Sequence, residues 1–387
     1  MTDELRRNRG VTVADVAREA GVGKATASRA LGDYGQVSSA TKERVLAAAE
    51  RLRYRPNEIA RSMNTGRTRT LGLVIGDIEN SYFSLAVRGI SDVAREAGYS
   101  VLLMNTSERV QEEIDAVRVL LDKRVDAIIC SPASAYVADH LRSVVASGLP
   151  LVLLDRHIDD VEAPVVSVLT RSATSRATTL LLEAGHRRVA FVSSLQTDGP
   201  DFQGFPLGNS SVTQRLEGIV DALEHASVPV DPSLFRFQVD STEAARRVVG
   251  ELLEQPDPPT ALIVSDSVIV LDVLRALRDR GVDVPSDMSL IVFDDPSWTA
   301  FTSPPLTVVA QPPYEVGTAA AQFALSLIDA ELDAALPELP LQARLIVRDS
   351  VAPRPAAAGI GAWEKAPIDV DEGLSLPEMD SNHQPAG

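Results

Sequence analysis

The first 55 residues carry apolar side chains at the spacing of short amphipathic helices. Val13, Val16 and Ala17 follow the i, i+3, i+4 pattern behind Thr12, a residue type that caps helix N-termini. A tight turn at residues 20–22 leads to a second predicted helix over residues 23–31, and Ser38 can cap a third. The apolar positions expected to face inward in these two helices are Ala27, Ala30, Leu31, Val45, Leu46, Ala49 and Leu52. The pattern predicts a helix–turn–helix, whose second helix enters the DNA major groove.

From residue 71 onward, short and mostly apolar runs alternate with amphipathic helical stretches. The predicted strands are residues 71–75, 101–104, 127–130, 151–154, 189–192, 235–237, 261–264 and 290–293, with helices expected at 83–97, 111–123 and 136–147. Strands that are apolar on both sides and separated by helices indicate a parallel sheet covered on both faces. We therefore predict two doubly wound lobes, and because ligands of such folds bind at the carboxyl ends of the strands, a ligand site between them.

The charge is divided unevenly along the chain. The net charge of −17 comes from 54 acidic and 37 basic side chains, which by itself argues against a nucleic-acid binder. Residues 1–69, however, hold two Lys and twelve Arg against eight acids, so this head is +6 and the remainder is −23. DNA binding is therefore expected to be confined to the head, since the acidic body repels phosphates.

Several classes of protein are excluded by what the sequence lacks. Cys130 is the single cysteine, so no intramolecular disulfide can form, and no Cys/His cluster has metal-site spacing. There is no apolar signal region at the start and no run of about 18 apolar residues, so a cytoplasmic protein without membrane contact is expected. No Gly-x-Ser-x-Gly elbow, phosphate loop or Gly-x-Gly-x-x-Gly after a strand is present. We therefore expect neither catalysis nor a cofactor.

The glycines at the start of the second helix allow three interpretations. In Gly21-Val22-Gly23-Lys24, a phosphate loop would require a longer glycine pattern after a strand, and neither is present. A dinucleotide-binding turn would require a third glycine where Thr26 stands. From the local spacing alone, an ordinary helical hairpin remains as an alternative to a DNA-reading motif.

The segment after the third helix is short and polar. Pro56 ends that helix, and residues 58–65 are long enough for one or two turns, which are not stable alone in water. Such a segment could fold when docked on DNA against a partner copy, with Met63 as an apolar wedge between base steps. A plain interdomain linker is the alternative interpretation.

Taken together, these motifs resemble the lactose-repressor/galactose-repressor (LacI/GalR) family of bacterial transcription regulators. The likeness in the head is carried by residues 11–31, by Tyr54-Arg-Pro-Asn57 and by Ala60-Arg-Ser-Met63. In the body it is carried by residues 77–83, 154–156, 185–189, 215–218, 284–287, 293–295 and 311–312. The resemblance implies a small all-α helix–turn–helix domain and an α/β periplasmic-binding-protein-like core of two doubly wound parallel-sheet lobes.

The resemblance also implies a division of the chain. It places the helix–turn–helix domain at residues 1–57, a hinge helix and linker at 58–70, and a two-lobed effector-binding and dimerisation domain at 71–351. Because the chain would cross between lobes three times, lobe 1 is expected at about 71–184 with 296–322, and lobe 2 at about 186–293 with 323–351. Residues 352–387 hold six acids and two bases without an apolar period, so a disordered tail is expected.

Residue roles in DNA binding follow from the same resemblance. It implies base contacts from Lys24, Ala25 and Arg29, and Arg29 suits a bidentate bond to guanine. Thr26, Ser28 and Asn57 would bind phosphates. The other positions expected to contact DNA are Thr12 and, within the hinge segment, Arg61 and Met63. A homodimer on a pseudo-palindromic operator in double-stranded DNA is expected, because the sequence lacks the leucine heptads that would indicate a tetramer.

The implied effector site departs from the family pattern. Its expected residues are Asp77, Tyr82, Phe83, Arg156, Arg215, Asp240, Asp266 and Asp294. Arg215 and Asp294 are retained, whereas an Asn-Asp pair is replaced by Asp266-Ser267 and an aromatic position by Asp240. Sugar recognition depends on amides and carboxylates that grip adjacent hydroxyls, so this site is expected to take an effector with an amine or cationic group. A sugar remains the alternative.

The function predicted from all of these features is a sequence-specific transcriptional repressor whose operator affinity is controlled by a small-molecule effector bound between the lobes. A solute-binding receptor for transport is the alternative, because it shares the two-lobe architecture. Such a receptor would need a secretion signal and no basic head, and this chain shows the reverse.

Overall fold

The computed structural model describes residues 11–32, 35–54, 66–196, 210–329 and 341–354. The hinge at residues 58–65 and the tail beyond residue 354, both predicted from the sequence, lie outside these ranges. Within them, no helix is long and apolar enough to cross a membrane.

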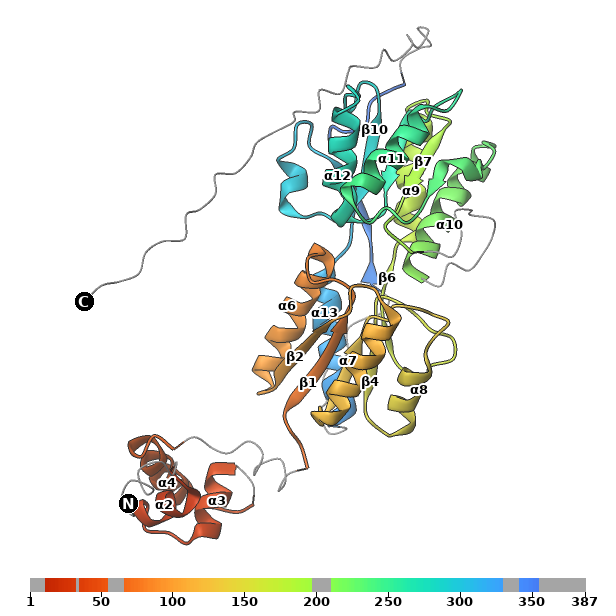
Figure 1. Ribbon diagram of the computed structural model, residues 1–387. Coiled ribbons are helices and arrows are strands. Elements are labelled where there is room, and N and C mark those ends of the chain that lie inside the picture. Colours follow the sequence, from red (N-terminus) through yellow and green to blue (C-terminus); the bar gives the residue numbers. More distant parts are fainter. Residues whose placement is uncertain (1–10, 33–34, 55–65, 197–209, 330–340, 355–387) are drawn as a thin grey trace, which may run out of the picture.

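The head consists of three helices around a small core of Val and Ala side chains (Figure 1). They are α2 (Val13–Glu19), α3 (Lys24–Gly32) and α4 (Ser39–Arg51). As predicted, Thr12 and Ser38 cap α2 and α4, and Thr12 forms a reciprocal capping box with Asp15. The expectation for Leu46 was wrong: its side chain is 47% exposed, because the turn of α4 brings Ala48 to the inner face instead.

Lobe 1 is a five-stranded parallel sheet in the order β2-β1-β3-β4-β5. Its strands are β1 (Thr70–Ile75), β2 (Ser100–Asn105), β3 (Ala127–Cys130), β4 (Leu151–Leu154) and β5 (Val165–Val166). Its helices are α6 (Ser81–Glu96), α7 (Val110–Asp122), α8 (Asp139–Ala146) and α13 (Pro313–Ile328). β1, β3 and β4 are buried almost throughout, which confirms the prediction of a sheet covered on both faces.

Lobe 2 repeats this plan with six strands in the order β13-β11-β10-β9-β7-β8. Its strands are β7 (Val189–Val192), β8 (Phe235–Arg236), β9 (Ala261–Val264), β10 (Ser289–Phe293), β11 (Thr307–Ala310) and β13 (Arg344–Ile346), of which β13 runs antiparallel to β11. Its helices are α9 (Arg171–Glu183), α10 (Ser210–His225), α11 (Thr242–Leu253) and α12 (Ser267–Arg278), with short 3-10 turns at Pro232–Leu234 and Ser297–Ala300. A two-stranded sheet of β6 (Val168–Leu169) and β12 (Leu341–Gln342) lies between the lobes (Figure 1).

Three segments belong to the lobe other than the one predicted. The sequence placed residues up to 184 in lobe 1, but α9 packs on α10 and also contacts β11 and β13 of lobe 2. β11 was likewise expected in lobe 1, yet it pairs with β10 through Val308 and Val292. The end of α13, expected in lobe 2, stays in lobe 1 because the whole helix packs on α6, β3 and β4. The apolar pattern of a helix or strand does not show to which of two similar lobes the element belongs. The sequence pattern alone could therefore not assign these three segments.

α6 and α13 approach each other closely enough that backbone touches backbone. A Cβ atom at Gly317 of α13 would lie 2.0 Å from the carbonyl oxygen of Ala86 in α6. No real Cβ atom occupies such a position, so a side chain of any size at residue 317 must push the helices apart. Gly317 therefore fixes how α13 lies along lobe 1.

We predict that Gly317→Ala destabilises the protein by roughly 1–3 kcal/mol, the usual effect of overpacking a tight core. Thermal unfolding followed by circular dichroism measures the change. Glu315→Ala, at an exposed position of the same helix, serves as the control and should shift the midpoint much less. Equal midpoints for Gly317→Ala and wild type would contradict the close packing described above.

Candidate functional site

The outer face of α3 carries the side chains that the sequence analysis assigned to base contacts. Ala27 and Ala30 are buried against the head core, so the helix turns Lys24, Ala25 and Arg29 outward, and all three are exposed. The guanidinium Nε of Arg29 donates to the carbonyl oxygen of Ala25 at 3.3 Å. Thr26 and Ser28 are half-buried beside this face.

Thr12 has a structural role in the head. Its hydroxyl donates to the Asp15 carboxylate at 2.7 Å and accepts from the backbone N–H of Asp15 at 3.4 Å. The Thr12 hydroxyl and the Thr12 backbone N–H, which both donate to the Asp15 carboxylate, lower the pKa of Asp15, so the carboxylate stays charged at the N-terminus of α2. The hydroxyl proton is therefore committed to the cap. The other predicted DNA contacts, Asn57, Arg61 and Met63, lie outside the described residues.

In lobe 1, the residue that follows β4 meets the start of α6. The Tyr82 hydroxyl donates to the Asp155 carboxylate at 3.1 Å, and both side chains are buried. Burial, and then the charge of Asp155, raise the pKa of Tyr82 well above its usual value, so this hydroxyl remains a donor. Phe83 packs edge-on against Tyr82 with ring centroids 5.5 Å apart. Asp77 lies apart from this pair, because its carboxylate accepts from the N–H of Glu79 and shapes the turn before α6.

Arg156, also at the end of β4, is held by a partner that the sequence did not reveal. Its two terminal nitrogens bind both carboxylate oxygens of Glu108 at 2.6 and 2.9 Å. One of them also donates to the carbonyl oxygen of Pro132 at 2.7 Å. Glu108 stands 48 residues away and belongs to no motif, so no sequence signal pointed to it.

In lobe 2, the buried side chains of Arg215 and Asp294 lie close enough for their charges to interact. The Arg215 guanidinium stacks 4.4 Å from the ring centroid of Phe293 and donates to the carbonyl oxygen of Ser265. The Asp294 carboxylate accepts from the side-chain amide of Gln311 at 2.8 Å. Burial raises the pKa of Asp294 to about 6, although Arg215 and Gln311 act to lower it. Gln311 belongs to the motif at residues 311–312, but the sequence did not predict it as a site residue.

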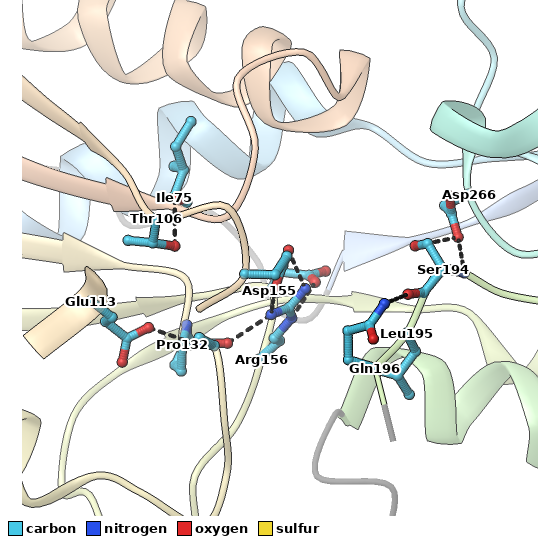
Figure 2. A network of polar contacts seen from close by, with 12 residues as sticks. Ile75, Thr106, Glu113, Pro132, Asp155, Arg156, Ser194, Leu195, Gln196 and Asp266 are labelled. Carbon is cyan, nitrogen blue, oxygen red and sulfur yellow. Dashed lines mark hydrogen bonds and ion pairs between the residues drawn. The ribbon is translucent and has the colours of Figure 1, made fainter. Parts of the chain in front are cut away.

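Asp266 is a second carboxylate on the lobe 2 side, and it is half-buried. One of its oxygens accepts from the backbone N–H of Ser194 at 3.2 Å, the Ser194 hydroxyl at 3.0 Å and the Ser265 hydroxyl at 2.7 Å. Asp240 is exposed and reaches this group indirectly, because Gln196 donates to both Asp240 and the Ser194 carbonyl. Figure 2 shows Ser194, Gln196 and Asp266 from lobe 2 on one side and Asp155 and Arg156 from lobe 1 on the other.

The two sets of side chains are close enough to influence each other across the lobes. The charge of Asp155 contributes to the raised pKa of Asp294, and that of Asp294 to the raised pKa of Tyr82. Direct contacts join the lobes nearby, where the hydroxyls of Ser81 and Ser267 lie 2.9 Å apart. We name as the interlobe site the residues that these interactions unite: Tyr82, Asp155, Arg215, Asp266, Asp294 and Gln311.

The interlobe site holds polar atoms that are buried yet unused. Within the part of the chain that the structure describes, Nε of Arg215, Oδ1 of Asp266 and Oε1 of Gln311 have no hydrogen-bond partner. A buried polar group without a partner costs roughly 1–3 kcal/mol, so a ligand that supplies partners gains that energy on binding. The site thus offers one donor and two acceptors to a polar ligand. The described residues contain no His, Cys, Asp and Glu group that could hold a metal ion.

Comparisons with known proteins bear on both halves of the chain. Residues 12–57 match the family model for bacterial regulatory proteins of the lacI family, and residues 178–351 match the model for periplasmic binding protein-like domains. Catabolite control protein A of Priestia megaterium is 31% identical over 331 residues, which cover 85% of this chain and 96% of that protein. The HTH-type transcriptional repressor CytR of Escherichia coli K12 is 31% identical over 330 residues, covering 84% and 92% of the two chains.

Solved structures show the same relationship. The lac repressor dimer bound to operator and the anti-inducer ONPF superposes with a TM-score of 0.74 and 25% identity, covering 89% of this chain and all of that one. The cellobiose complex of the regulator CelR superposes with a TM-score of 0.62 and 27% identity, covering 88% and 99%.

These matches confirm the resemblance and the fold class predicted from the sequence. The match over residues 12–57 favours a regulator over a solute receptor, because it covers the DNA-reading head. CytR is named as a transcriptional repressor and CelR as a transcriptional regulator. The chain belongs to the lacI family of bacterial regulatory proteins and is a DNA-binding transcriptional regulator.

Proposed function

We propose that this protein is a cytoplasmic repressor that binds a pseudo-palindromic operator through α3, and that an effector in the interlobe site changes its operator affinity. The proposal depends on one combined observation. The same chain presents an exposed Lys24–Ala25–Arg29 face on α3 and an interlobe site with buried polar atoms that have no hydrogen-bond partner among the described residues. The operator complex of the similar lac repressor supports the DNA arm of the proposal.

A homodimer fits the apolar side chains exposed on both lobes. Leu85 on α6 is 45% exposed, and Val268 and Leu271 on α12 are 44% and 52% exposed. The two helices begin at the Ser81–Ser267 contact and lie on the same side of their lobes in Figure 1. A second copy that covers this strip would bury it and place two heads on one operator.

The charge of the interlobe site favours an effector with an amine or cationic group. Asp155, Asp266 and Asp294 bring three carboxylates to the site, and Arg215 is the cation among the residues that define it. Burial disfavours the ionised form of Asp294. A cationic group bound beside this carboxylate would stabilise the ionised form. Relatives crystallised with cellobiose and with ribose keep a neutral sugar as the second candidate.

The interlobe site is connected to the linker of the head by α13. Gln311, which binds Asp294, directly precedes Pro312, the N-cap residue of this helix. At its other end, the carbonyl oxygen of Ile328 accepts from Arg67 at 2.7 Å, and Arg67 lies 3.6 Å from the Asp329 carboxylate. Figure 1 shows α13 running from the junction of the lobes to the end of lobe 1 where β1 begins. A movement of lobe 2 that displaces Gln311 is therefore passed to the residues just after the hinge.

The linker is fastened to lobe 1 beside this contact. The Asp126 carboxylate accepts from the backbone N–H groups of Thr68 and Arg69, each at 2.8 Å. Such charge-assisted bonds hold backbone tightly. Residues 67–69 thus follow lobe 1 and α13 as one unit, and an effector that alters the lobes also alters where the chain leaves for the head.

For the DNA interface, we predict that Arg29→Ala weakens operator binding by about 1–3 kcal/mol, the usual value of an arginine–guanine pair. Gel-shift titration against upstream DNA of its own locus measures this loss. Arg44→Ala, an equal loss of charge at an exposed position of α4, is the control and should cost less and act equally on all sequences. Specific binding that survives Arg29→Ala unchanged would overturn the assignment of α3.

For the effector, we predict pH-dependent binding of an amine. Because the pKa of Asp294 is raised to about 6, its carboxylate is ionised at pH 7.5 and mostly protonated at pH 5. A cation that pairs with the ionised form should therefore bind roughly tenfold more weakly at pH 5. Calorimetric titration with putrescine, spermidine and glucosamine, beside glucose and cellobiose, tests this.

The matched variant for that titration is Asp294→Asn, which keeps an acceptor for Gln311 but cannot ionise. It should bind the amine weakly and with little dependence on pH. Tight binding of a neutral hexose by wild type, with no response to amines, would refute the charge preference and leave the sugar as effector.

For the connection through α13, we predict that Arg67→Ala brings the ratio of operator Kd values, measured with and without the effector, closer to one. The loss of coupling should be about 2- to 30-fold, the range found for residues along such paths. Fluorescence anisotropy with labelled operator gives both Kd values, and taking their ratio cancels the general loss of one charge near DNA. Arg88→Ala, which removes an exposed ion pair on α6, is the control. An unchanged ratio in Arg67→Ala would rule out this route.

A further inference from the structure

The two terminal nitrogens of the Arg156 guanidinium are occupied by groups of its own lobe, whereas Nε has no hydrogen-bond partner among the described residues. Glu108 takes both terminal nitrogens in a bidentate pair, and the Pro132 carbonyl shares one of them. The remaining nitrogen, Nε, lies 3.8 Å from the Asp155 carboxylate. Burial acts to lower the pKa of Arg156, but the adjacent Glu108 carboxylate raises it overall, so the guanidinium stays charged. A planar arginine with two parallel N–H groups is the usual grip for a carboxylate or a phosphate, and here a side chain fills it.

The loop that carries Glu108 is shaped to deliver this carboxylate. Ser107 and Glu108 both have left-handed backbone conformations, with φ of +51° and +58°, which are unfavourable for residues other than glycine. Thr106 fixes the loop start by donating its N–H and hydroxyl to the carbonyl oxygen of Ile75, at 3.0 and 3.1 Å (Figure 2). A Cβ atom at Gly76 would lie 2.1 Å from a Glu108 carboxylate oxygen, so the glycine makes the space that the carboxylate fills.

This ion pair lies where the lobes meet. Asp155, the neighbour of Arg156, belongs to the interlobe site, and the N–H of His157 on the other side donates to the Ser210 hydroxyl of lobe 2 at 2.9 Å. In Figure 2 Arg156 faces the group formed by Ser194, Leu195 and Gln196. The side chain of Glu108 is 36% exposed and that of Arg156 is 12% exposed, so solvent reaches the pair.

We infer that Glu108 is a tethered carboxylate that occupies an anion-binding position at Arg156 and thereby excludes anionic effectors from the interlobe site. This inference rests on the proposed function, since it names the class of effector that the site admits. With Glu108 in place, the positive charge of Arg156 is neutralised, and an incoming phosphate or carboxylate meets Asp155, Asp266 and Asp294. Without Glu108, the same two N–H groups face outward as an anion site. Glu108 is in this sense a specificity-determining residue that selects uncharged or cationic ligands.

The test uses the full-length protein and inorganic phosphate as the probe, measured by isothermal calorimetry. We expect Glu108→Ala to bind phosphate at least tenfold more tightly than wild type does, and Glu108→Ala/Arg156→Gln to lose that gain. Glu112→Ala, which removes an exposed acid four residues along the chain, is the matched control and should not gain binding. Phosphate held by the basic head is common to all variants and cancels in the comparison.

Glu108→Gln provides a second variant in case the alanine variant does not fold, because it removes the charge and keeps an acceptor for Arg156. Folded variants that bind phosphate no more tightly than wild type does would overturn the inference. A gain that persists in the double variant would do so too, since Arg156 would not be the site. Operator gel shifts on wild type report separately on the proposed function, so loss of that function and failure of this inference give different results.

Discussion

The parallel direction of the strands in each sheet, β13 apart, is the constraint on which the site depends. In a parallel sheet the carboxyl ends share one edge, so Asp155 and Asp294, which each follow a strand, lie at such edges. Three crossings of the chain hold the two edges opposite each other. The interlobe site is therefore a consequence of topology: residues distant in sequence meet because each of them, except Arg215 within α10, ends a strand or begins a helix.

This arrangement gathers carboxylates away from water, and the protein compensates for them in two different ways. In lobe 2, Arg215 and Gln311 only partly offset the burial of Asp294, whose raised pKa leaves it poised near neutral pH. In lobe 1, Glu108 and Arg156 neutralise each other completely. The balance of the site is consequently acidic, which is the basis of the proposed preference for a cationic effector.

Much of the fold could be predicted from the sequence, because strands such as residues 127–130 and 189–192 are uniformly apolar and end where the structure ends them. The lobe assignment of α9 could not, since its apolar face fits either sheet. Tyr82, Arg215, Asp266 and Asp294 were placed by family resemblance and do meet, whereas Asp240 is exposed at the margin. Glu108 was missed because its partner is distant in sequence and its backbone conformation leaves no local pattern.

The central claim is that effector and operator act on the same equilibrium between lobe arrangements. Thermodynamic linkage makes this testable, because two coupled ligands must change each other's affinity by the same factor. The direct measurement is the Kd of the amine selected from the panel, obtained by calorimetry for the free protein and for the operator-bound protein. If the two ligands are coupled in this way, these two values differ by the factor by which the amine changes the operator Kd. Equal amine affinities in the two states would contradict the central claim.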